Sequence, residues 1–182
     1  MGLMDILMQA GGGTLLDQVA KQAGVNPDQA EDLIKNVGSA MFGQLKGRVE
    51  SDKVDSSSLD DLLRDSKYVN MLERPERHLE SPRMQEEGND ILSYITGSKK
   101  GSREVAKQVS EKTGFSASLI KSLLPMLAPL IIGSLSKGVQ SGHVNLNPGG
   151  SKELGGLAGM LDFDHDGSII DDVAGMAMKY IF

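Results

Sequence analysis

The chain is most apolar between Leu119 and Leu135, where it reads LIKSLLPMLAPLIIGSL. Lys121, Pro125 and Pro129 interrupt this stretch, so its unbroken apolar part is much shorter than the roughly 20 residues that a membrane-spanning helix needs. We therefore expect a helix that is kinked at its prolines and buried on all sides, and no membrane span. Each proline removes one backbone N–H from the helix, and such a kink creates either a packing contact or a groove for a partner.

The composition narrows the fold class and the cellular setting. The 182 residues carry a net charge of −6, which argues against non-specific binding to nucleic acids or anionic membranes. The chain has no cysteine, and its N-terminus lacks the basic region of a secretory signal, so we expect a cytoplasmic protein. Ten methionines and the absence of tryptophan favour helical packing, and no stretch has a strong strand pattern. The predicted fold class is all-α.

An internal repeat at an offset of about 90 residues relates two parts of the chain, residues 5–50 and 90–140. The clearest match is VAKQAGVN at 19–26 with VSEKTGFS at 109–116. The repeat predicts one helical domain over residues 1–140, made of two related units.

Each unit predicts a helix, a glycine that ends it, and a second helix that begins at a capping residue. Gly24 and Gly114 are placed to take the left-handed conformation at a helix end. Asn26 and Ser116 are residue types that cap helix N-termini. Between the units, we expect Ser58 to cap a further helix.

Two segments with many glycines and serines are predicted to separate the helices. Residues 97–101 (GSKKG) predict a turn, and residues 141–153, which include Pro148 and two glycines, predict a flexible linker. The remaining residues, 154–182, would then form a C-terminal loop and helix.

The C-terminal loop carries the strongest chemical signal, DFDHDGSIIDD at residues 162–172. Asp162, Asp164 and Asp166 occupy positions 1, 3 and 5 of a calcium-binding loop, and Ser168 offers a backbone carbonyl at position 7. Oxygen ligands in a flexible loop favour Ca²⁺ over Mg²⁺ or a transition metal. The spacing therefore predicts a Ca²⁺ site.

The end of this loop departs from the calcium-binding pattern. Ile170 and Val173 occupy positions 9 and 12, so Asp171 or Asp172 would have to complete the site. An alternative is that Ser168 and Asp171 form a capping box at the start of the terminal helix. The two interpretations are compatible, and a bound cation would relieve the repulsion among five carboxylates and order the C-terminus.

Residues 16–37 are similar to the helix-turn-helix of bacterial repressors. The second helix of such a motif must present cations and hydrogen-bond donors to DNA. Here it offers Asp28, Glu31 and Asp32 on the face expected to be exposed, followed only by Lys35. We keep a DNA-binding regulator as the alternative function, but we do not expect a nucleic-acid partner.

Two parts of the sequence can be compared with a known family. One is the run LLPMLAPL at residues 123–130, which is followed by Gly133 and Leu135. The other is the tail, which is rich in Gly and Leu and carries the Asp loop. Together they resemble the bacterial DUF937 family, which includes YidB-like proteins. The resemblance implies a helical bacterial protein and implies no activity. The first unit departs from the pattern, because it has Lys35 and Asn36 at the positions where the second unit has Pro125 and Met126.

The chain shows no constellation of residues typical of catalysis, so we do not expect an enzyme. We expect a helical scaffold or protein-interaction module that self-associates as a homo-oligomer, with a further protein partner as a second possibility. The Ca²⁺ loop would order its C-terminus.

Overall fold

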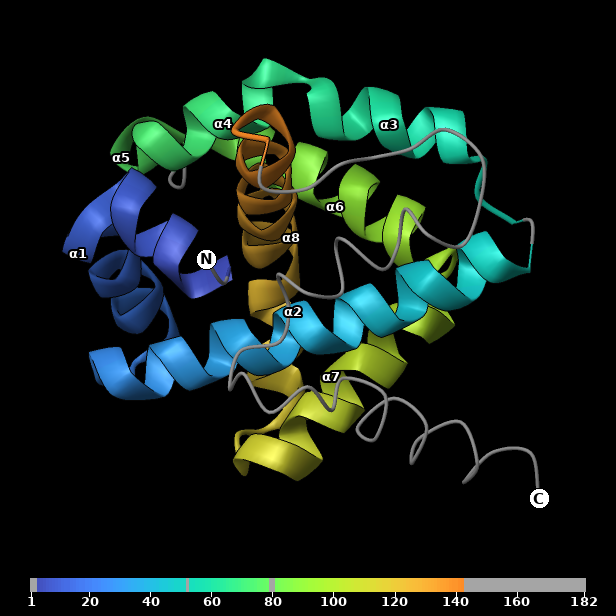
Figure 1. Ribbon diagram of the computed structural model, residues 1–182. Helices are drawn as coiled ribbons and strands as arrows, with labels where there is room; N and C mark the ends of the chain where they lie inside the picture. Colours follow the sequence, from blue (N-terminus) through green and yellow to red (C-terminus); the bar gives the residue numbers. More distant parts are fainter. Residues whose placement is uncertain (1–2, 52, 79–80, 143–182) are drawn as a thin grey trace.

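A long apolar helix, α8 (Ala117–Gln140), runs through the middle of the other helices (Figure 1). The computed structural model describes residues 3–51, 53–78 and 81–142. Every regular element in these ranges is an α-helix, as predicted. The predicted linker beyond Gly142 and the C-terminal loop and helix lie outside the described residues.

Seven helices precede α8 in the chain and surround it. They are α1 (Leu3–Ala23), α2 (Pro27–Glu50), α3 (Ser56–Arg64), α4 (Ser66–Glu73), α5 (Pro75–His78), α6 (Pro82–Thr96) and α7 (Lys99–Thr113). Helices α1, α2, α3, α4, α6 and α7 all contact α8. The buried apolar side chains of both predicted units and of the helices between them form one continuous core.

The burial of α8 differs along its length. Every residue from Met126 to Ser136 is buried, whereas Ser118, Lys121 and Ser122 in the first turns are exposed. The prediction of burial on all sides is therefore wrong for the start of the helix, where Ile120, Leu123 and Leu124 are buried on one side and the polar side chains face solvent on the other. By length and composition α8 could cross a membrane, but 72% of its most apolar 18-residue stretch is buried inside this structure.

Two glycines allow other helices to approach α8 closely. A Cβ atom at Gly88 of α6 would lie 1.7 Å from the carbonyl oxygen of Pro125. A Cβ atom at Gly133 of α8 would lie 2.5 Å from the carbonyl oxygen of Tyr68 in α4. Because side chains larger than hydrogen would clash with backbone at these points, the glycines set the distances of α6 and α4 from the central helix.

The predicted helix ends in the two units are confirmed. Gly24 and Gly114 have φ angles of +67° and +79°, a conformation that is strained for residues with a Cβ atom. Asn26 caps α2 by accepting a hydrogen bond from the N–H of Gln29 at 2.8 Å, and Gln29 returns a bond in a capping box. Ser116 caps α8 in the same way through the N–H of Leu119.

Two smaller predictions, one between the units and one inside the second unit, are wrong. The helix expected to be capped by Ser58 begins at Ser56, with Asp55 at the cap position. The turn expected over residues 97–101 is shorter, because α7 already begins at Lys99. Its cap is Ser98, whose hydroxyl oxygen accepts a hydrogen bond from the N–H of Gly101 at 3.1 Å.

A cation ties the end of α2 to the end of α6. Arg48 of α2 donates hydrogen bonds from Nη1 to the backbone carbonyls of Ser93, at 3.2 Å, and Tyr94. Carbonyls in the last turn of a helix lack partners within the helix, and the negative end of its dipole favours a cation. Arg48 therefore links the two predicted units, because the carbonyls it contacts belong to residues that lie 45 and 46 positions later in the chain.

Candidate functional site

A groove of about 470 Å³ opens beside the exposed start of α8. Three helices form it: the C-terminal end of α1, the first turns of α6, and α8 around Pro125. Its lining residues are Gln22, Ser81, Pro82, Met84, Gln85, Ser122, Pro125 and Met126. The groove therefore lies at the proline-containing turn of α8 that the sequence singles out.

The start of α6 is positioned by its cap and by its crossing with α8. Ser81 accepts a hydrogen bond from the N–H of Arg83 at 3.2 Å, and Pro82 occupies the first helical position, where its missing N–H costs nothing. Gly88, one turn beyond Met84, meets the backbone of Pro125. The groove lies on the N-terminal side of this crossing.

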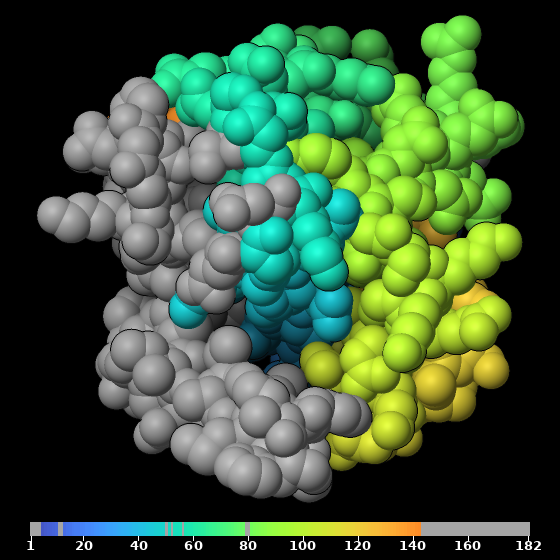
Figure 2. All heavy atoms as spheres, turned by 90° about the vertical axis from the view of Figure 1, so that its right-hand side faces the viewer, coloured from blue at the N-terminus to red at the C-terminus, as the bar shows by residue number. Residues whose placement is uncertain are grey.

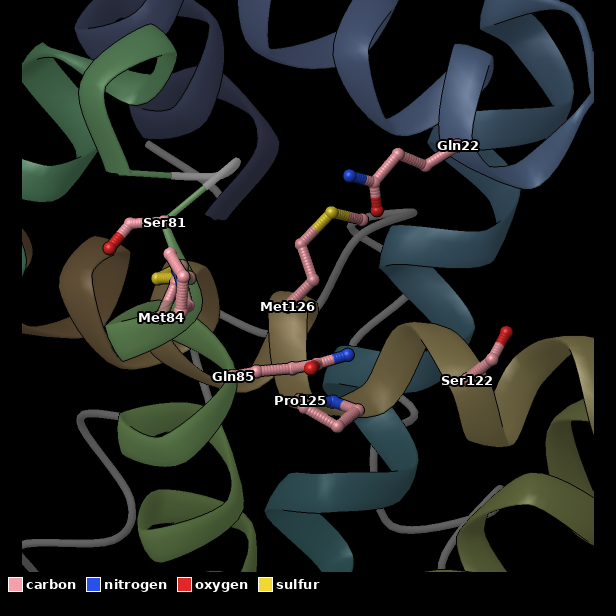
Figure 3. Close-up of a pocket in the computed structure, with 8 residues that line it drawn as sticks. Gln22, Ser81, Met84, Gln85, Ser122, Pro125 and Met126 are labelled. Carbon is pink, nitrogen blue, oxygen red and sulfur yellow. The ribbon is translucent and has the colours of Figure 1, made fainter.

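The groove combines an apolar floor with a neutral polar rim. Met84 and Met126 form the floor and are only 3% and 7% exposed, whereas Gln22, Gln85 and Ser122 are exposed. Figure 3 shows Met126 extending from α8 towards the amide of Gln22 on α1, with Gln85 beside Pro125. Methionine side chains adapt their shape to different apolar partners, and amides and hydroxyls can bond the polar backbone of a bound chain.

The prolines of α8 release two backbone carbonyls from the helix ladder. Pro129 cannot donate to the carbonyl of Pro125, and this oxygen packs against Gly88 instead. Pro125 cannot donate to the carbonyl of Lys121, one turn earlier on the exposed part of α8. The free carbonyl of Pro125 thus allows close packing with α6, and the free carbonyl of Lys121 is a hydrogen-bond acceptor next to the groove.

A second pocket, of about 320 Å³, adjoins the groove and shares Ser81 and Met84 with it. It adds charged side chains. Lys67 of α4 lies 2.7 Å from a carboxylate oxygen of Glu87 in α6, and the hydrogen bond that Lys67 donates to this carboxylate raises the pKa of Lys67. His78 and Arg83 also line it. The two pockets together form a surface with one neutral part and one charged part.

The six predicted Ca²⁺ ligands all lie outside the described residues. They are Asp162, Asp164, Asp166, Ser168, Asp171 and Asp172. Within the part of the chain that the structure describes, no group of three or more His, Cys, Asp or Glu side chains could hold a metal ion. The calcium site therefore stays a prediction from the sequence.

The helix-turn-helix-like segment 16–37 forms the end of α1, the turn at Gly24 and the start of α2. Asp28 and Asp32 are exposed on α2, and Glu31 pairs with Lys35 at 2.8 Å. The local turn thus resembles that of a DNA-binding motif, while the charged side chains exposed at the start of α2 are those of two aspartates.

The sequence indicated the prolines of α8 but missed the other walls of the groove. Gln22 lies about 100 positions before Ser122, and Ser81 and Gln85 lie between them. The one local signal was Gly88 within a helical pattern, since a glycine inside a helix often marks close backbone contact. That signal shows a crossing but does not name the helix that is crossed.

Comparison with known proteins identifies the family. No curated protein and no solved structure matches the chain. The family described as bacterial protein of unknown function (DUF937) matches residues 5–138, which include the caps, the glycine crossings and the groove described above. The chain therefore belongs to the DUF937 family of bacterial proteins.

Proposed function

We propose that this protein is a non-catalytic helical scaffold that binds an extended or helical polypeptide segment in the groove between α1, α6 and α8. The observation that carries the proposal is the combination of a methionine floor with a rim of amides and hydroxyls. None of the eight lining side chains has a titratable group that works near neutral pH, so the groove suits binding better than proton transfer.

The proposed occupant is a segment of a second copy, so that the scaffold self-associates. Among the described residues, Met8 is the one exposed large hydrophobic side chain, at 46%, which does not favour a flat apolar dimer interface. The chain itself supplies a suitable insert, because its last ten residues, 173–182, read VAGMAMKYIF. Insertion of an apolar side chain into the groove would bury it without requiring a large interface.

We test this with a pair of tryptophan substitutions on exposed serines of α8. Ser122→Trp would fill the mouth of the groove, whereas Ser118→Trp places the same side chain one turn earlier, at a residue that does not line it. Light scattering over a range of concentrations should show that the first variant associates at least tenfold more weakly than wild type. The second variant should behave as wild type. A monomeric wild type, or equal effects of both substitutions, would overturn self-association through the groove.

The second part of the proposal is that residues 162–172 bind Ca²⁺ and so order the C-terminus. The support is the spacing of Asp162, Asp164 and Asp166 and the mutual repulsion of the carboxylates. Calorimetry should detect Ca²⁺ binding in the wild type and weaker binding in Asp164→Ala. If Ca²⁺ up to about 10 mM gives neither heat nor a change in melting temperature, the site does not exist, because a ligand stabilises the state that binds it.

The alternative, a DNA-binding regulator that uses residues 16–37, is less well supported. Asp28 and Asp32 would face the phosphates of a duplex and be repelled. A gel shift on mixed duplexes at low salt should show no retardation. Retardation that Asp28→Lys strengthens would favour this alternative.

A further inference from the structure

The outer face of α7 is a row of cations. Lys99, Lys100, Arg103 and Lys107 are all exposed, and the first, third and fourth recur every four residues along one side of the helix. We call these four residues the basic stripe. The opposite side of α7 packs into the core through Val105, Ala106 and Val109. Figure 2 shows the surface to which α6 and α7 contribute, beside the C-terminal part of α2.

The basic stripe is unfavourable for the isolated helix. Like charges four residues apart repel each other, and cations in the first turn oppose the positive end of the helix dipole. Lys99 and Lys100 occupy that first turn. Within the described part of the chain, the stripe forms no ion pair that would offset this cost. An anionic ligand would remove the repulsion.

The charge of the chain is distributed unevenly, and one other segment complements the stripe. Residues 99–121 contain six basic and two acidic residues, a net charge of +4 in a chain whose net charge is −6. Residues 143–182 contain two basic and six acidic residues, a net charge of −4. Five of these acids lie within the predicted calcium loop, residues 162–172.

We propose that the basic stripe of α7 is the docking surface for the acidic segment 162–172 of the same chain. The tether is long enough, because Asp162 lies 20 positions after Gly142 and a chain of this length can span about 65 Å, compared with about 36 Å for the whole of α8. A covalent tether of this length gives a local concentration near the millimolar range, which makes weak ion pairs effective within one molecule.

Docking would also compete with calcium, and this consequence rests on the proposed Ca²⁺ site. The carboxylates of Asp162, Asp164 and Asp166 cannot point into a metal-binding loop and pair with the stripe at the same time. In this scheme Ca²⁺ releases the segment from α7, and removal of Ca²⁺ returns it. Docking itself is measured without Ca²⁺, so that it can be judged apart from the calcium proposal.

The test uses a spin label on the tail, which the chain allows because it has no cysteine. Ala158→Cys places a single label four residues before Asp162 and outside the segment proposed to enter the groove, and the amide signals of the 19.4 kDa protein are recorded by NMR in EDTA. The signals of α7 should broaden selectively at low salt and recover at about 0.5 M NaCl, where charges are screened within a few ångströms.

A charge-reversal variant and a matched control show whether the stripe is responsible. Lys99→Glu, Arg103→Glu and Lys107→Glu together should abolish the broadening. The fold should tolerate them, because all three side chains are exposed and the new row of like charges replaces an existing one. The control changes three exposed cations elsewhere, as Lys53→Glu, Arg74→Glu and Arg77→Glu, and should keep the broadening.

The remaining outcomes are separable. Molecules without a spin label can be observed in a mixture with spin-labelled ones. Broadening of their α7 signals would show that the stripe binds the tail of a second copy, and would overturn docking within one chain. Absence of broadening, with a duplex or RNA shifting the same α7 signals, would make the stripe a nucleic-acid surface and also overturn docking. If broadening occurs and Ca²⁺ does not reduce it, docking stands and competition with calcium fails.

Discussion

Helices α2 and α8 begin in the same way but occupy different places in the fold. Both have 24 residues, and both follow a left-handed glycine and a capping side chain. Yet α2 exposes Asp28 and Asp32 along one side, whereas α8 is buried throughout from Met126 to Ser136. Local hydrogen bonds thus set where a helix begins, and the side chains around its whole circumference set how deeply it lies.

The difference can be followed position by position at the offset of 90 residues. Where α2 has Gln44 and Lys46, α8 has Ser134 and Ser136, which are small enough to lie fully buried. Ser134 satisfies its hydroxyl by donating to the carbonyl of Leu130 at 2.8 Å. Short polar side chains of this kind can enter a core that glutamine and lysine cannot enter without losing their hydration.

The largest expected effect separates the two helices at equivalent glycines. Gly133→Ala should destabilise the protein by about 2 kcal/mol, because the new methyl group would press on the backbone of Tyr68. Gly43→Ala should instead stabilise it by up to about 1 kcal/mol, because no atom lies within 4 Å and alanine favours the helix. Urea unfolding of both variants measures the difference. Equal effects would show that α2 and α8 are packed alike.

The next effect should be the same in both helices, because capping is local. Asn26→Ala and Ser116→Ala should each cost about 1 kcal/mol, since each removes one hydrogen bond to an N–H of the first turn. Thermal unfolding of the two variants gives the comparison. A cost at Ser116 several times that at Asn26 would mean that the cap also supports the packing of α8.

A smaller and opposite effect is expected inside α8. The hydroxyl of Ser136 is buried and has no hydrogen-bond partner among the residues that the structure describes, so Ser136→Ala should stabilise the protein by about 1 kcal/mol. Ser134→Ala is the control, and it should change stability less because its hydroxyl is already bonded. Urea unfolding that shows Ser136→Ala to be destabilising would reveal a partner for this hydroxyl.

The smallest effect concerns pH and lies near the end of α6, where Tyr94 is close to Arg48. Burial raises the pKa of Tyr94, so folding favours its protonated form. The stability that the protonated Tyr94 contributes is therefore intact below pH 10, and it is lost as the pH rises through the pKa of Tyr94 in the folded protein. Tyr94→Phe should weaken the fall in stability above about pH 10, as measured by urea unfolding. An unchanged fall would exclude Tyr94 as a cause.

The sequence predicted the elements better than their contacts. The helical class, the glycine stops and the caps at Asn26 and Ser116 all follow from interactions within a few residues, and the structure confirms them. The groove did not follow, because Gln22, Met84 and Met126 come together only when α1, α6 and α8 pack. The predicted Ca²⁺ ligands lie outside the described residues and stay a prediction.

By itself the sequence determined that the chain is helical and where the helices of its two predicted units meet, because a cap or a left-handed glycine acts on the backbone within one turn. Tertiary packing decided that α8, and not α2, became the central helix. It also decided that Arg48 caps a helix 45 residues away and that the Pro125 carbonyl meets Gly88. These outcomes depend on the shapes of several helices at once, and no local pattern contains that information.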